Sequence, residues 1–163
     1  MAPQGRVVVS PAIAGSERRL LSVVLLGAAD GDLDEAALER AIKPYGGRME
    51  QLADGSTLVV IETDRHVATD QAAQAARCAL AIRAITGDWP LAIAVGRAES
   101  TQPGLHEGGV IDRASRLISQ AATARGGVPP IALDEVSAGL LDARFDVVEG
   151  DAGPMLLGER DRR

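Results

Sequence analysis

The acidic segment from Asp30 to Glu35, Asp-Gly-Asp-Leu-Asp-Glu, carries side chains that could ligate a metal ion. It resembles the opening of a calcium-binding loop, whose acidic side chains supply oxygen ligands. That loop also needs a glycine at its sixth position and a bidentate glutamate at its twelfth, where this chain has Glu35 and Ala41. The segment therefore fits better as a helix start, because acidic side chains stabilise a helix N-terminus. Asp32, with Glu35 three residues later, is the predicted first residue of that helix.

Asp112 and Arg116 are a second group of charged residues with a meaningful spacing. They stand four residues apart in a segment with helical periodicity, so their side chains are neighbours on one helix. Arginine can bind phosphate oxygens, but an acid at this spacing favours an ion pair of roughly 0.2–0.5 kcal/mol and partly neutralises the arginine. We therefore expect a surface ion pair in preference to a functional site.

The other reactive residue types lack the partners that catalysis or metal binding needs. His66 and His106 are single histidines in predicted loops, with no second ligand at metal-binding spacing. Cys78 is the only cysteine, which excludes an internal disulfide and a cysteine cluster for zinc. It falls in an alanine-rich helical pattern and is predicted to be a small buried residue.

Composition and charge exclude several classes of partner. The 163 residues include 17 Lys and Arg against 23 Asp and Glu, for a formal net charge of −6. Nucleic-acid-binding domains usually carry a basic surface, and one Phe, one Trp and one Tyr offer few rings for base stacking. No apolar run approaches membrane-spanning length, and no signal peptide is recognisable. We expect a cytoplasmic domain that binds neither nucleic acid nor membrane.

The order of strand-like and helix-like patterns predicts an α+β fold. The first six elements are a strand, a helix, two hairpin strands, a helix and a strand, which is the split βαβ arrangement of ferredoxin-like sheets. The hairpin turns at Asp54-Gly55, a dipeptide typical of a two-residue type I′ turn. Short C-terminal strands are appended. The predicted elements are strands at 20–26, 48–53, 56–62, 90–98, 131–133, 145–149 and 155–157, and helices around 36–42 and at 69–85, 110–124 and 135–141.

Three segments resemble the catalytic domain of class III nucleotidyl cyclases. Residues 45–50, Tyr-Gly-Gly-Arg-Met-Glu, are similar to the Tyr-Gly-Gly-x-Val-Glu that leads into the central hairpin of that family. The alanine-rich residues 71–80 look like the helix after that hairpin. Residues 110–117, Val-Ile-Asp-Arg-Ala-Ser-Arg-Leu, resemble its Thr-Val-Asn-x-Ala-Ala-Arg-Leu segment. The resemblance covers roughly residues 18 to 158 and implies a cyclase-like ferredoxin sheet.

The resemblance implies a two-metal site, which this chain does not retain. In the family, two carboxylates hold two metal ions that activate the ribose hydroxyl and neutralise the phosphates. Gly27 stands at the first carboxylate position and Gly55 at the second. Asp30 and Asp54 are nearby acids that could substitute only if both were displaced favourably. We therefore expect no cofactor, and Mg²⁺ or Mn²⁺ only if a residual site exists.

The nucleotide-binding positions implied by the resemblance are also degenerate. Gln51 replaces the lysine that reads the adenine base, and Gly109 replaces the aspartate. Asp112 stands where an asparagine orients the ribose, and its charge would repel a triphosphate. Only Arg116 is retained, at the position that stabilises charge on the phosphates.

These substitutions predict a catalytically inactive cyclase-homology domain with a regulatory or assembly role. Two alternatives are a ligand-sensing module without turnover and a weakly active cyclase with displaced carboxylates. We expect residues 1–17 to be a flexible arm or linker, 18–158 the domain, and 159–163 the start of a linker to a further domain. The hairpin residues 53–56, Ala-Asp-Gly-Ser, resemble those of degenerate domains placed between a protein kinase domain and an ATPase domain in large bacterial proteins, and residues 157–161 look like the approach to such an ATPase domain. The expected partners are a second copy, through the cyclase-type interface, or other domains of the same chain.

Overall fold

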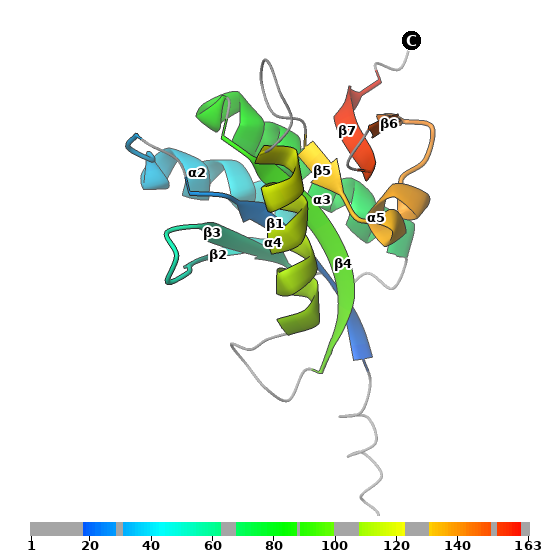
Figure 1. Ribbon diagram of the computed structural model, residues 1–163, viewed down its shortest axis with the longest axis horizontal. Helices are drawn as coiled ribbons and strands as arrows, with labels where there is room; N and C mark the ends of the chain where they lie inside the picture. The colour runs from blue at the N-terminus through cyan, green and yellow to red at the C-terminus, as the bar shows by residue number, and fades with distance from the viewer. Residues whose placement is uncertain are drawn as a thin grey trace, which may run out of the picture.

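The structure is a computed structural model that describes residues 18–28, 31–62, 68–87, 89–99, 108–122, 131–150 and 153–160. It is an α+β fold, as predicted (Figure 1). His66 and His106 lie outside the described residues. The elements are β1 (Arg18–Leu26), α2 (Glu35–Ile42), the 3₁₀ turn η1 (Lys43–Tyr45), β2 (Gly47–Gln51), β3 (Thr57–Ile61), α3 (Ala68–Thr86), β4 (Leu91–Glu99), α4 (Gly108–Ala122), β5 (Ile131–Leu133), α5 (Glu135–Leu140), β6 (Phe145–Gly150) and β7 (Gly153–Glu159).

The seven strands form one sheet in the order β2-β3-β1-β4-β5-β7-β6. Strand β1 lies between β3 and β4 and is antiparallel to both. Strands β1 and β2, joined through α2, are therefore separated by β3, and β3 and β4, joined through α3, are separated by β1. This is the predicted split βαβ core. The late strands extend it, with β5 parallel to β4 and the β6–β7 hairpin at the far edge.

Two apolar layers cover the two faces of the sheet. Along β1, Val24 and Leu26 pack toward α2 and α3, whereas Val23 and Leu25 pack toward α4. All four are at most 2 % exposed, so this strand is buried on both faces of the sheet. Figure 1 shows α4 in front of the sheet and α3 behind it.

Helix α3 packs closely on the sheet because its inner face consists mostly of alanine. Ala72, Ala75, Ala76 and Ala79 on this face are 0–3 % exposed. Cys78 is fully buried among them, and desolvation raises the pKa of its thiol to about 12.

The start of α2 differs from the prediction. Asp34, and not Asp32, is the N-cap residue, because its Oδ1 accepts a hydrogen bond of 3.0 Å from the amide of Ala37. The 3₁₀ turn after α2 ends at Gly46, which is left-handed with φ 72°, as the Tyr-Gly-Gly sequence predicts. Among the described helices, none has both the length and the apolar character to cross a membrane.

Candidate functional site

Gly27, the predicted first metal-carboxylate position, directly follows β1 and is closed by neighbouring side chains. Its amide donates a 2.9 Å hydrogen bond to the carbonyl of Pro90, which fixes the backbone. A Cβ atom added to Gly27 would lie 2.9 Å from Cγ of Pro90 and 3.1 Å from Cγ2 of Ile118 on α4. The space into which a carboxylate would extend is therefore occupied by apolar groups.

The second position, Gly55, lies in the β2–β3 hairpin loop. Its amide donates to the carbonyl of Leu52 at 3.0 Å, and the amide of Leu52 donates to the carbonyl of Ser56 at 2.9 Å. With Gly55 at φ +90°, this is a three-residue loop that ends in a left-handed residue. The prediction of a two-residue type I′ turn is therefore wrong: the loop contains one more residue, and Gly55 provides its left-handed conformation.

The fold places the two metal positions beside each other. A Cβ atom on Gly55 would lie 3.5 Å from Cβ of Ala28, the residue that follows Gly27. A side chain at Gly55 would also be strained, because L residues rarely adopt a φ of +90°. The architecture thus brings the two positions together, but neither glycine can be exchanged for an aspartate without a local rearrangement.

Asp54, the substitute acid in the hairpin, is engaged by its own turn. Its Oδ1 accepts hydrogen bonds from the amide of Ser56 at 2.9 Å and from the hydroxyl of Ser56. These two bonds lower the pKa of the Asp54 carboxyl. The other substitute, Asp30, lies outside the described residues. Within the described ranges no group of three or more His, Cys, Asp or Glu could hold a metal ion, so the described residues do not fit a two-metal site.

The base-reading positions are separated between two elements. Gln51 ends β2, and its amide Nε2 donates a 2.7 Å hydrogen bond to Oε1 of Glu35 at the start of α2. Gly109 lies at the N-terminus of α4, exposed, with open space around it. Gln51 therefore links the hairpin to α2, and Gly109 offers no side chain to a ligand.

The predicted ion pair between Asp112 and Arg116 is not formed. Both side chains are exposed, and neither has an ion pair with any described residue. An exposed pair gains too little free energy to hold two long side chains in one geometry. Arg116 consequently keeps an uncompensated charge at the surface of α4.

Arg116 lines a groove of about 530 Å³ between α4, the β5–α5 junction and the start of β7. The apolar part of its wall includes Leu117, Val136 and Pro154. This volume falls in the range of small-molecule sites. Ile118, which closes the Gly27 position, is two residues further along and lies roughly 160° around the helix from Arg116. The structure therefore separates Arg116 from the two glycine positions within one chain.

Arg113 and Asp134 are structural residues of this groove that the sequence interpretation missed. Oδ2 of Asp134 lies 3.6 Å from Nε of Arg113 and accepts a 3.2 Å hydrogen bond from the amide of Val95. Oδ1 of Asp134 caps α5 through the amide of Ser137 at 2.8 Å. Arg113 also donates to the carbonyl of Val95, which connects α4, β4 and α5. An aspartate just before a short helical pattern is an N-cap signal that could have identified Asp134.

Comparison with known proteins places this geometry in a structural class. No family model matches the sequence, and a search of curated proteins finds no match. The guanylyl cyclase domain of the RhoGC fusion protein from Blastocladiella emersonii superposes with a TM-score of 0.62 at 19 % identity, over 88 % of this chain and 97 % of that one. That domain has also been solved as a non-canonical dimer.

Two further solved structures agree with this match. The guanylate cyclase domain of RhGC from Catenaria anguillulae, in complex with GTP, has a TM-score of 0.58 at 16 % identity, covering 89 % of this chain and all of that one. The adenylyl cyclase CyaB from P. aeruginosa has a TM-score of 0.56 at 15 % identity, covering 90 % and 96 %. At these identities the likeness establishes the fold. The chain has the fold of class III nucleotidyl cyclase catalytic domains.

Proposed function

We propose that this chain is a catalytically inactive domain of cyclase-like fold, with a regulatory or assembly role in a larger signalling protein. The observation that carries the proposal is the closed Gly27 position, where a Cβ atom would lie 2.9 Å from Pro90 and 3.1 Å from Ile118. A cyclase needs an acid there to hold its metal ions. The proposal therefore rests on two observations: the chain has no acid at Gly27, and the side chains of Pro90 and Ile118 occupy the space that an acid there would need.

The surrounding positions support the same function. Gly55 has a φ of +90° that disfavours any acid, and Asp54 is held by Ser56. Gln51 occupies the predicted position of a base-reading lysine, and its side-chain amide donates a hydrogen bond to Glu35. Each of these features removes one requirement for turnover, while the sheet and the helices that position them are kept.

The proposed partners follow from the retained scaffold. A domain that keeps its fold without its chemistry can still present the surfaces through which such domains associate. We propose association with a second copy or with other domains of the same full-length protein, with residues 1–17 and the segment after Glu159 as the connections. A similar guanylyl cyclase domain has been solved as a dimer, which supports the first possibility.

A calorimetric titration with ATP and with GTP, each with excess Mn²⁺, tests the proposal together with a cyclic-nucleotide assay. An active guanylyl cyclase domain, assayed in parallel, serves as the positive control. We expect no cyclic product from either nucleotide. Product that disappears in Asp54→Asn or Asp30→Asn would contradict the proposal and support a weakly active cyclase with displaced carboxylates.

The groove around Arg116 favours a second candidate function, ligand sensing without turnover. Arg116 has no hydrogen bond or ion pair with the described residues, so its guanidinium is available to an anionic ligand. Under this function, Arg116→Ala should weaken nucleotide binding by roughly 10-fold or more, the effect of one charge-assisted hydrogen bond. Arg48→Ala, an exposed arginine on β2, is the matched control and should bind as the wild type does. Binding that is equal in both variants would exclude a role for Arg116.

A further inference from the structure

A second pocket lies on the opposite face of the sheet, away from the cyclase-like site. It has a volume of about 320 Å³ and is lined by η1, one side of α3 and the start of β6. Its walls contain Asp70, Gln74 and Arg77 from α3, Tyr45 from η1, and Arg144 immediately before β6. Asp70, Gln74 and Arg77 share one side of α3 because they are spaced by four and three residues.

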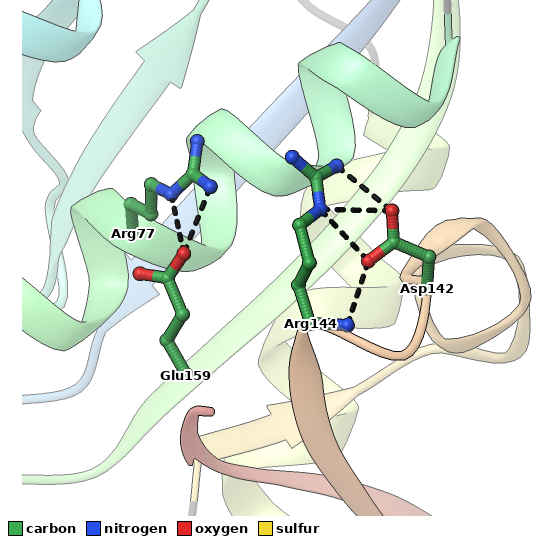
Figure 2. A network of polar contacts seen from close by, with 4 residues as sticks. All are labelled: Arg77, Asp142, Arg144 and Glu159. Atoms are coloured by element: carbon green, nitrogen blue, oxygen red, sulfur yellow. Dashed lines mark hydrogen bonds and ion pairs between the residues drawn. The ribbon is translucent and has the colours of Figure 1, made fainter. Parts of the chain in front are cut away.

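Two carboxylates outside the pocket hold its two arginines in place (Figure 2). Nε and Nη2 of Arg77 donate to Oε1 of Glu159 at 2.9 and 2.8 Å, and its guanidinium lies 5.6 Å from the ring centre of Phe145. Nε of Arg144 donates to both oxygens of Asp142 at 2.9 Å, and its Nη2 lies 2.8 Å from Oδ2. Each arginine is therefore oriented through the same edge of its guanidinium.

The other edge of each guanidinium is unused. Nη1 of Arg77 and Nη1 of Arg144 have no hydrogen-bond partner among the described residues. In Figure 2 the unbonded nitrogen of Arg144 points toward Arg77. Asp142 and Glu159 neutralise the two guanidinium charges, but they leave both Nη1 groups without an acceptor. An oxyanion could accept a charge-assisted hydrogen bond from each arginine.

The rest of the wall restricts the charge of the ligand. The carboxylate of Asp70 has no ion pair with the described residues and lies about 10 Å from Arg77 along the helix axis, two turns away. Gln74 donates Nε2 to the carbonyl of Tyr45 at 2.6 Å, which fixes η1 against α3. Counted with Asp142 and Glu159, two cationic and three anionic groups surround the pocket, so it disfavours a doubly charged anion and suits a ligand whose negative charge is balanced by an amine.

We propose that this pocket binds a small carboxylate, which accepts hydrogen bonds from Nη1 of Arg77 and Nη1 of Arg144. Asp70 disfavours doubly charged phosphates and suits a carboxylate that also carries an amine. The proposal is independent of the cyclase-like site, since none of its residues takes part in the argument about Gly27, Gly55 or Arg116. Glu159 ends β7, and its ion pair with Arg77 connects β7 to α3. A ligand bound to Arg77 therefore contacts one partner of that ion pair.

The test is a heteronuclear NMR titration of the 163-residue chain, following the amides of Ala73 and Gln74 and the side-chain Nε–H groups of Arg77 and Arg144. The probes are acetate, β-alanine and inorganic phosphate, each at constant ionic strength. Arg144→Gln removes one donor, and Arg48→Gln is the matched control, since Arg48 also pairs with acids at the surface. Urea unfolding of each variant verifies that the fold is retained.

We expect saturable shifts with acetate or β-alanine, and affinity at least roughly 10-fold weaker in Arg144→Gln but unchanged in Arg48→Gln. Asp70→Asn should strengthen phosphate binding relative to acetate, because it removes the repelling charge. The proposal is overturned if no probe saturates below roughly 100 mM, a limit of about −1.4 kcal/mol. Equal affinity in Arg144→Gln, or phosphate that binds the wild type more tightly than acetate and β-alanine do, would also overturn it.

Discussion

The two sides of helix α4 have opposite characters. On one side Ile118 packs against Gly27 and fills the first metal position with a methyl group. On the other side Arg116 faces a groove of about 530 Å³ and has no partner among the described residues. A single helix thus closes one part of a cyclase-like site and leaves another part open. The difference teaches that packing can close the predicted metal-carboxylate position while an arginine on the same helix stays open to solvent.

The largest effect is expected when an acid is placed at Gly27, the predicted first metal-carboxylate position. Gly27→Asp would overlap Pro90 and Ile118 and place a carboxylate among apolar groups, so we expect a loss of about 3–5 kcal/mol in the free energy of unfolding. Gly109→Asp is the matched control: the site on the same helix as Ile118 is open, and we expect a change within about 0.5 kcal/mol. Urea unfolding measures both. A stable Gly27→Asp variant that binds Mn²⁺ would show that the position is not closed.

The second acid should be less costly to restore. Gly55→Asp places a Cβ atom at φ +90°, which we expect to cost about 1–3 kcal/mol in the free energy of unfolding. Gly55→Asn should cost less, because asparagine tolerates the left-handed region better. Thermal unfolding of both variants gives the comparison. Equal stability of Gly55→Asp and the wild type would mean that the loop adopts another conformation.

The open side of α4 contains two arginines with different roles. Arg113→Ala leaves the buried carboxylate of Asp134 without its ion pair, and we expect a loss of about 1–2 kcal/mol in unfolding free energy. Arg116→Ala removes no contact with a described residue and should change stability by less than about 0.5 kcal/mol. Urea unfolding separates the two variants. If Arg116→Ala lowered the free energy of unfolding more than Arg113→Ala does, Arg116 would be the structural arginine and Arg113 the one available to a ligand.

The smallest expected effect is a pH dependence at the hairpin. The pKa of Asp54 is lowered in the folded chain, so its contribution to stability is present at neutral pH and is lost as the pH falls below 3.8, the ordinary value. Because Asp54 is exposed, we expect only a few tenths of a kcal/mol. The unfolding free energies of the wild type and Asp54→Asn should therefore converge as the pH falls below 3.8. A gap that widens toward low pH would contradict the role of the Ser56 hydrogen bonds.

The sequence predicts the fold well where local pattern and burial agree. The continuous apolar run of β1 and the alanine stripe of α3 both predict elements that the structure contains. The cap of α2 was placed two residues early because Asp32 and Asp34 are equally good N-cap types, and only the hydrogen bond to Ala37 distinguishes them.

The residue types of the candidate site could be predicted from the sequence, but the free space around each residue could not. The degenerate positions are visible in the sequence, yet the closure of Gly27 depends on Pro90 and Ile118, which are distant in the chain. The groove beside Arg116 likewise lies between elements distant in the sequence, namely α4, the β5–α5 junction and the start of β7. The absent Asp112–Arg116 pair shows that spacing alone does not decide an exposed ion pair, because its gain is comparable to the side-chain entropy it costs.

Because Cys78 is buried, its reaction with a thiol reagent reports how often helix α3 separates from the sheet. With no exposed surface and a thiol pKa of about 12, this single cysteine reacts with a maleimide reagent only when α3 separates from the sheet. At high reagent concentration the labelling rate becomes the rate of that separation, and at low concentration it reports the equilibrium population of the opened state. Every variant described above can thus be timed in the native buffer, without denaturant and without an introduced probe.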